Sequence, residues 1–305
     1  MKKIFKLTIY RRNALFAYMF LLPWLFGLFA FAVYPIFHSL RVSVSSVRQM
    51  PGEVIINHYG WGHYVYLFTI NTDFREFLIN DLTFIGVSLL IVLPFSLIIA
   101  VLLNIKFPAR ALFRLVFFLP VIIMSGPVIH AVMGDLDATG FLNNPILFPF
   151  FSILPEATWN AVWFVLSNLV TFMWFSGVQI LIFLAGLQKI DSSVYEAASI
   201  DGANGWEKFW KITLPYMKIL ILINAIYTVV EIANFGGTAT VIAYDVDDIT
   251  DQVGQVNHFI LDNVTNTARF HSLSAAASWV YFGGIALVIV AILLVYKFFD
   301  GGERR

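Results

Sequence analysis

Long apolar runs separated by short polar stretches dominate the pattern of this chain. A helix needs about 20 predominantly apolar residues to cross a lipid bilayer. Six runs are long enough, and they cover residues 14–37, 77–103, 112–133, 161–187, 217–243 and 278–299. Only helices and closed barrels satisfy their backbone polar groups within a membrane. The pattern therefore predicts an all-α, polytopic membrane protein with six transmembrane helices.

The first apolar run is expected to stay in the mature protein. It follows a basic segment, residues 1–13, and is too long for the apolar region of a signal peptide. It also lacks a small-residue cleavage site followed by a polar sequence. We therefore predict a first transmembrane helix at 14–37 and a membrane core at 77–299.

Basic residues gather on one side of the predicted membrane. Fifteen of the 19 Lys and Arg residues fall in alternate connections: the N-terminal segment, the 104–114 connection, the loop after the fourth span and the C-terminal end. The other side holds only Arg41, Arg48, Arg75 and Arg269. Cytoplasmic connections carry such an excess. We expect both termini, including the tail 300–305, and the loop 188–216 in the cytoplasm.

Composition removes several classes of protein. Hydrophobic residues make up 59% of the 305 residues and charged residues 12%, which excludes a soluble domain. The chain has no cysteine, so disulfides, thiol catalysis and cysteine metal sites are excluded. Its formal net charge is zero, so bulk attraction to nucleic acid is not expected.

A polar stretch, residues 196–219, interrupts the apolar pattern between the fourth and fifth runs. Ser193 and Glu196 have the spacing of a capping box at the start of a short helix, and Asp201-Gly202 predicts its end and a turn. Asn204 and Glu207 predict the start of a second helix.

The second helix of this loop is expected to end at Leu214-Pro215. Its aromatic residues Trp206, Phe209 and Trp210 recur at steps of three and four, which puts them on one helix face. We expect this face to pack against the ends of neighbouring helices and the first helix to face water.

This loop resembles the EAA signature of the membrane subunits of ATP-binding-cassette (ABC) importers, commonly written EAAxxDGAxxxxxFxxIxLPxxxP. The one departure is Ile219, which stands where the signature has its last proline. Ten positions match at the same spacing: Glu196, Ala197, Ala198, Asp201, Gly202, Ala203, Phe209, Ile212, Leu214 and Pro215.

The resemblance implies a type I ABC importer permease whose loop docks on a separate ATPase. It implies as partners a second permease, two ATPase subunits and an extracytoplasmic solute-binding protein, in a bacterial or archaeal plasma membrane. The chain contains no GxxxxGK[ST] phosphate-binding loop, so ATP and Mg²⁺ are expected on the ATPase and no cofactor on this chain.

Three further segments resemble the carbohydrate importers of this family. They are Gly62-His63-Tyr64 with Asn80-Asp81, Arg114 with residues 117–120, and Gly236-Gly237. The resemblance implies a sugar or oligosaccharide as the solute. Another solute such as glycerol phosphate is the alternative within the family.

Two stripes of polar and aromatic residues predict a solute pathway, because transport needs polar groups facing a cavity at membrane depth. The alternative is that these side chains only hydrogen-bond neighbouring helices. We take Glu231 as the only acidic residue within a span, and such carboxylates are functional candidates. The stripes comprise Asn168, Thr171, Trp174, Phe175 and Gln179 in the fourth span and Asn224, Tyr227, Glu231 and Asn234 in the fifth.

Other chemistry is not supported by the sequence. The acidic loop at residues 245–251 lacks the EF-hand spacing, and no HExxH joins the histidines, so we expect no metal site. No GxSxG motif suggests a hydrolase, so we expect no enzyme. A secondary transporter working alone is disfavoured by the absence of detectable inverted repeats. A membrane scaffold would be favoured if the polar stripes faced lipid.

Overall fold

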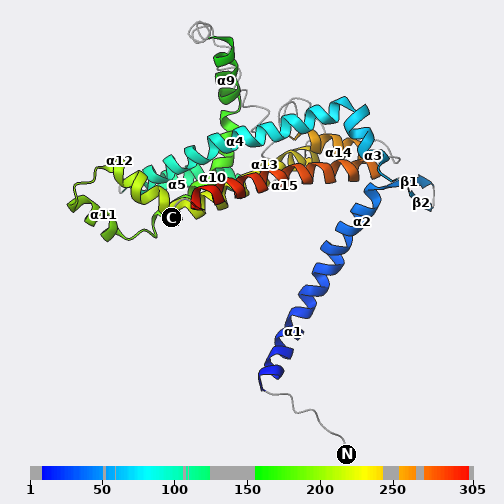
Figure 1. The fold of residues 1–305 in the computed structure, drawn as a ribbon, viewed down its shortest axis with the longest axis horizontal. Helices are drawn as coiled ribbons and strands as arrows, with labels where there is room; N and C mark the ends of the chain where they lie inside the picture. Colours follow the sequence, from blue (N-terminus) through cyan, green and yellow to red (C-terminus); the bar gives the residue numbers. More distant parts are fainter. Residues whose placement is uncertain are drawn as a thin grey trace, which may run out of the picture. The chain divides into compact units, whose positions relative to one another are not determined.

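The computed structural model describes residues 9–50, 53–58, 60–105, 108, 110–123, 155–242, 254–265 and 271–301. The chain divides into two compact units. The first comprises Met1–Thr72 and Asp262–Val280, and the second Asp73–Leu261 and Tyr281–Arg305. Figure 1 shows the elements of both units along the chain.

The first unit begins with a long apolar helix. It runs through α1 (Ile9–Leu28), the π turn η1 (Phe29–Val33) and α2 (Tyr34–Ser43). The sequence pattern placed the end of this helix at Phe37. The helix continues to Ser43, whose hydroxyl donates to the carbonyl oxygen of Leu40 and lies 2.8 Å from the Tyr64 hydroxyl.

A β-hairpin follows, which the helical pattern did not predict. Strand β1 (Ser45–Met50) pairs antiparallel with β2 (Glu53–His58), with Ser45 opposite His58 and Met50 opposite Glu53. Helix α3 (Gly62–Val65) and the π turn η2 (Tyr66–Ile70) come next. His63 Nε2 lies 3.2 Å from the Ser45 carbonyl oxygen, and burial lowers the pKa of this imidazole. His63 is therefore neutral at pH 7, and its contact with Ser45 joins α3 to the start of the hairpin.

The second unit is built on long helices. Helix α4 (Thr72–Asn104) is followed by α5 (Arg110–Ile123), α9 (Glu156–Ser167) and α10 (Leu169–Leu187). The chain then forms α11 (Ser192–Ile200), α12 (Gly205–Lys208), the π turn η3 (Phe209–Thr213) and α13 (Leu214–Ile242). Helices α14 (Gln255–Thr265) and α15 (His271–Gly301) complete the order, and the boundary between the two units falls within each of them.

Helix α10 is the centre of this unit, because it packs against both α5 and α13. Its residues Ile180, Phe183 and Leu187 are buried with Leu97 of α4 and Met217 of α13 in one apolar core. At Gly186, α10 and α13 approach so closely that an added Cβ would collide with the Leu220 side chain. Interdigitated packing of this kind fixes how the two helices face each other.

Four helices of the described chain are long and apolar enough to cross a membrane: Phe16–Ser43, Thr72–Asn104, Gly205–Asn234 and His271–Phe298. A fifth candidate is the pair Thr171–Leu187 and Ser192–Ile200, which bends by 67°. Part of the predicted span 112–133 lies outside the described residues, since α5 is described to Ile123. The described residues thus contain four or five of the six predicted spans.

Candidate functional site

Helix α11 opens the loop between α10 and α13, but the residue that caps it differs from the one predicted. Asp191 is the N-cap, and its side chain accepts a hydrogen bond of 3.0 Å from the backbone N–H of Ser193. The predicted Ser193–Glu196 capping box is therefore wrong. Ser and Asp are both good N-caps two positions apart, and the Asp191 carboxylate also favours the positive helix end. This backbone hydrogen bond lowers the pKa of the Asp191 carboxyl group, which stays charged at pH 7.

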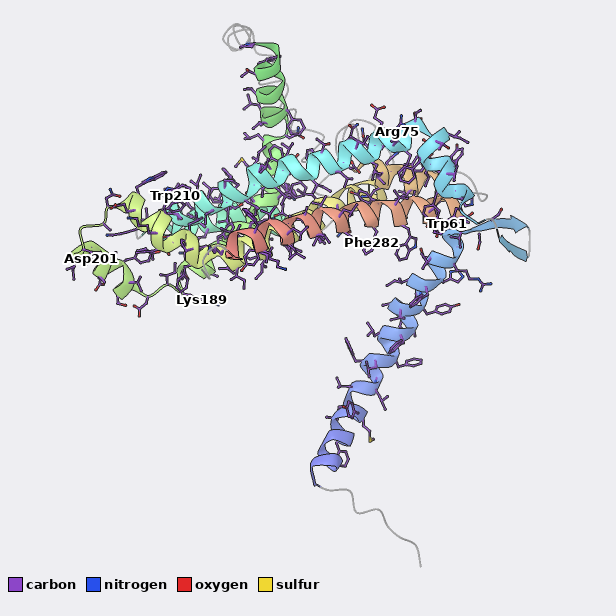
Figure 2. All side chains as sticks on the ribbon, in the orientation of Figure 1. Trp61, Arg75, Lys189, Asp201, Trp210 and Phe282 are labelled. Carbon is purple, nitrogen blue, oxygen red and sulfur yellow. The ribbon has the colours of Figure 1, made fainter. Side chains whose placement is uncertain are left out.

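The turn after α11 has the geometry that its glycine suggested. Gly202 has φ of +83°, a left-handed conformation that L side chains rarely adopt. The N–H of Ala203 donates to the Ala198 carbonyl at 2.9 Å, and the N–H of Gly202 to the Ser199 carbonyl at 3.2 Å. These two bonds form a Schellman motif. Figure 2 shows Asp201 at this turn, between α11 and α12.

Helix α12 begins with the predicted capping box. The Asn204 side chain accepts from the Glu207 N–H at 2.9 Å, and the Glu207 carboxylate accepts from the Asn204 N–H at 3.0 Å. The predicted end at Leu214-Pro215 is wrong, because the helix continues through η3 into α13. Pro215 stands at the second position of α13, directly after the π turn, where a proline is tolerated.

Two side-chain contacts tie α11 to the helix that follows it. The Tyr195 hydroxyl lies 2.9 Å from Thr213 Oγ1. Lys208 Nζ donates to the Ser199 hydroxyl at 2.6 Å. The loop is therefore a folded helix–turn–helix unit whose shape depends on its own hydrogen bonds.

The residues of the loop that match the EAA signature differ in how exposed they are. Glu196, Ala197 and Asp201 are exposed, whereas Ala198 and Ala203 are half-buried. In the second helix, Phe209, Ile212 and Leu214 are half-buried and Pro215 is exposed. Helix α11 and its C-cap Asp201 thus expose two carboxylates and the small side chain of Ala197, beside the exposed apolar side chains of Val194 and Ile200, so the surface is open to a partner.

The aromatic residues of the second helix line an apolar groove of about 590 Å³. Trp206 packs edge-on against Trp210 with ring centroids 5.5 Å apart. Phe209 shares the groove with Leu97 of α4 and Phe183 of α10. The two tryptophans pack only partly on neighbouring helices, since Trp206 is 70% and Trp210 49% exposed. Figure 2 labels Trp210 on this second helix of the loop.

A network of polar side chains joins α10 to α13. Its residues precede Phe183 of the groove in α10 and follow Ile221 of the groove in α13. Gln179 is fully buried, and its Nε2 donates to Glu231 Oε2 at 2.8 Å and to Thr228 Oγ1 at 2.9 Å. Asn224, also fully buried, donates to the Gln179 backbone carbonyl at 3.3 Å. The structure therefore brings three of the predicted pathway residues, Gln179, Asn224 and Glu231, into one hydrogen-bonded network.

The predicted stripe on α13 changes character along its length. Asn224 is buried, Glu231 is half-buried, and Tyr227 and Asn234 are exposed. The Asn234 amide donates to the Val230 carbonyl at 2.9 Å. Tyr227, Glu231 and Asn234 thus form an open face, which the buried Gln179 supports from behind.

The remaining pathway candidates on α9 and α10 are mostly buried. Asn168 ends α9, and its amide donates to the Phe164 carbonyl at 2.9 Å. Trp174 and Phe175 are buried and Thr171 is half-buried. Asn168 also breaks the predicted span 161–187 into α9 and α10. Within this chain these four side chains do not form an open face like that of α13.

One buried carboxylate was missed by the sequence reasoning. Asp81 lies inside α4, with 3% of its surface exposed, so the view that Glu231 is the only acidic residue in a span is wrong. Asp81 accepts hydrogen bonds from the backbone N–H groups of Gly254, Gln255 and Val256. The available signal was its place within the predicted span 77–103, next to Asn80.

Metal binding is not supported by any described cluster. The described residues include no group of three or more His, Asp and Glu side chains that could hold an ion. The acidic residues at 245–251 lie outside the described residues.

Comparison with known proteins places this geometry in a family. The chain is 32% identical over 221 residues to a probable ABC transporter permease protein, YesP, of Bacillus subtilis, covering 71% of this chain and 69% of the relative. The chain belongs to the ABC transporter permeases. It is also 29% identical over 304 residues to the lactose transport system permease protein LacF of Rhizobium radiobacter, covering 94% of each chain. No protein-family model matches the chain.

Solved structures share the permease fold. This chain resembles one chain in the crystal structure of a bacterial ABC transporter involved in the import of the acidic polysaccharide alginate. The TM-score is 0.68 at 22% identity, and the match covers 94% of this chain and 96% of that chain. A bacterial alginate ABC transporter in complex with a periplasmic protein gives a TM-score of 0.66 and 21% identity, covering 92% and 93%. The similarity to YesP, together with the helices long enough to cross a membrane, makes the chain a membrane-embedded subunit of the ABC permease family.

Proposed function

We propose that this permease forms half of the import pathway for a sugar or oligosaccharide. The observation that carries the proposal is the full-length similarity to a lactose transport permease, together with the polar face of α13. A carboxylate and an amide, from Glu231 and Asn234, offer the acceptors and donors that a hydroxyl-rich solute needs. The side chain of Tyr227 adds an aromatic face suited to a sugar ring.

The loop at residues 188–216 is proposed to couple this pathway to a separate ATPase. The exposed face of α11, with Glu196, Ala197 and Asp201, is the surface that would dock. The Schellman turn at Gly202 joins α11 to the next helix, and the hydrogen bond between Tyr195 and Thr213 joins α11 to the π turn before α13, so these contacts are the proposed route from α11 to α13. Glu231 lies on α13, so the docking surface on α11 and the pathway are joined through the turn at Gly202 and the helix that runs from Gly205 to α13.

The proposed assembly contains a second permease, two ATPase subunits with ATP and Mg²⁺, and an extracytoplasmic solute-binding protein. Its support is the EAA signature and the fold shared with a transporter solved in complex with a periplasmic protein. Both termini are proposed to be cytoplasmic in a bacterial or archaeal plasma membrane, since 15 of the 19 basic residues lie on that side.

Reconstitution tests the proposed function. The complete complex, with the second permease and the two ATPase subunits, is reconstituted in vesicles with ATP inside. Labelled lactose, arabino-oligosaccharides and glycerol phosphate are supplied outside with the binding protein. We expect uptake of a carbohydrate that requires both ATP and the binding protein. Uptake of glycerol phosphate alone would select the other solute class, and uptake without the ATPase would contradict coupling.

A further inference from the structure

Asp81 of α4 holds the first turn of α14 from inside the second unit. Its Oδ1 accepts from the Gly254 N–H at 3.1 Å and the Gln255 N–H at 3.2 Å, and its Oδ2 accepts from the Val256 N–H at 3.2 Å. These N–H groups belong to the start of a helix, where four donors have no partner within the helix. A carboxylate from a distant element therefore caps α14.

Gly254 makes this capping geometry accessible to the backbone. Its φ of +78° lies in the left-handed region that favours glycine. Val256, which follows it in the first turn, is fully buried. The Asn80 amide donates to Gln255 Oε1 at 3.2 Å, and the rings of Phe74 and Phe259 lie 5.2 Å apart. Polar and apolar contacts thus dock α14 on α4.

Helix α14 also contacts α13 at the proposed pathway. The Asn257 amide donates to the backbone carbonyl of Ala233 at 2.9 Å. Ala233 lies between Glu231 and Asn234 in sequence, and those residues form part of the open face of α13. A shift of α14 would therefore move or break a hydrogen bond to the α13 backbone beside Glu231 and Asn234.

A buried carboxylate is a costly way to join two helices. Removing a charge from water is unfavourable unless hydrogen bonds compensate, and an apolar side chain would pack at lower cost. Three N–H donors and the positive end of a helix supply this compensation. Hydrogen bonds depend on direction, whereas apolar packing does not. The carboxylate therefore fixes the position of the first turn of α14 relative to Asp81 of α4.

We propose that Asp81 is a positioning residue for transport, whose carboxylate clamps α14 onto α4 and thereby holds the Ala233 segment of α13 in place. The clamp itself is a property of this chain, whereas its effect on uptake rests on the proposed function. Asp81 does not contact solute in this proposal and acts only through α14 and Asn257.

Amide hydrogen exchange tests the clamp without reference to solute. In the purified full complex, Asp81→Ala should speed exchange at residues 254–258 by about tenfold or more, as expected for the loss of hydrogen bonds to a charged group. Asp81→Asn keeps one oxygen acceptor and should give a smaller increase. Exchange in residues 192–208 should not change. Glu76→Ala, which removes an exposed carboxylate from the same helix, is the matched control.

Uptake and chemical rescue test the positioning role. Asp81→Ala should lower the maximal rate of carbohydrate uptake about tenfold, with basal ATP hydrolysis retained and Asp81→Asn intermediate. Because the chain has no cysteine, Asn80→Cys and Gln255→Cys can be added to Asp81→Ala and joined by a short bifunctional thiol reagent. The cross-link should restore uptake, and the same protein without the reagent should stay impaired.

Each outcome decides a separate point. Unchanged exchange at 254–258 in Asp81→Ala would overturn the clamp, and faster exchange with wild-type uptake would overturn its role in transport. If Asp81→Ala does not assemble, Asp81→Asn decides both points. If the unmodified complex takes up no carbohydrate, the proposed function fails, while the exchange result still decides whether the clamp exists.

Discussion

Glu231 shows how this permease holds an acidic side chain within a transmembrane helix. The carboxylate is half-buried and receives a hydrogen bond from Gln179, whose amide also donates to Thr228. Gln179 itself is fully buried, so it fixes the carboxylate without reaching the open face. Both residues were predicted to line the solute pathway. In the structure Gln179 supports Glu231 from the interior, and of the two only Glu231 lies on the open face of α13.

Replacing Glu231 by Gln tests its role in the pathway. The change keeps the volume and removes the charge, and neutral acceptors bind donors more weakly than carboxylates do. For a neutral, hydroxyl-rich solute we expect uptake to fall about tenfold, with the complex assembled and basal ATP hydrolysis retained. For a cationic solute the loss should be near complete. Unchanged uptake in both Glu231→Gln and Glu231→Ala, over a range of solute concentrations, would show that the residue only joins helices.

The residues that sequence reasoning recovered are those whose role is set by neighbours in the chain. Gly202 and the Asn204–Glu207 pair were predicted because turns and caps are determined within a few positions. The capping role of Asp81 was not predicted, because its partners at residues 254–256 are 173 to 175 positions away. No local pattern predicts that the start of α14 meets the carboxylate of α4.

At the scale of elements, the contact between α10 and α13 organises the second unit. Gly186 lets the two helices approach, since an added Cβ would meet the side chains of Leu220 and Met217. The helices themselves were predictable from apolar runs, but their ends were less so. The helix containing α13 begins at Gly205 rather than Met217, because the π turn η3 carries it past Pro215.

Gly186→Ala should weaken this contact. Overpacking of a close-packed seam costs about 1–3 kcal/mol, because neighbouring side chains must shift. The matched control is Gly86→Ala in α4, where an added Cβ meets no atom within 4 Å. We expect thermal unfolding of the purified complex at a lower temperature for Gly186→Ala and no lower than wild type for Gly86→Ala. Equal stability of the two variants would contradict the close approach of α10 and α13.

At the scale of the whole molecule, charge determines how the chain is expected to lie in the membrane. The described helices supply four or five spans, and the predicted six spans place both termini on one side. The distribution of Lys and Arg then assigns that side to the cytoplasm. This assignment depends on residues throughout the chain and not on any single contact.

Fusions and labels test this topology. A reporter joined after Arg305 should be active only as a cytoplasmic protein, and a tag inserted near Asp248 should react with an impermeant reagent from outside intact cells. A tag in the loop at 188–216 should stay unlabelled unless the membrane is opened. Labelling of the C-terminal end from outside would overturn the six-span arrangement.

The central claim is that the loop at 188–216 couples the permease to a partner ATPase, and the turn at Gly202 tests it most directly. An added Cβ at Gly202 meets no atom of this chain within 4 Å, so a side chain there is opposed by the φ of +83° and not by a clash within the chain. Valine in this conformation costs about 1–2 kcal/mol, whereas asparagine adopts it more readily. Size and conformation can therefore be separated by two substitutions at one position.

The deciding measurement is ATP hydrolysis stimulated by the solute-loaded binding protein, made together with uptake in vesicles that contain the complete complex. Gly202→Val should lose most of the stimulation and the uptake, whereas Gly202→Asn and the control Gly205→Ala should retain both. Normal stimulation and uptake in a fully assembled Gly202→Val complex would contradict the assignment of this loop as the coupling element.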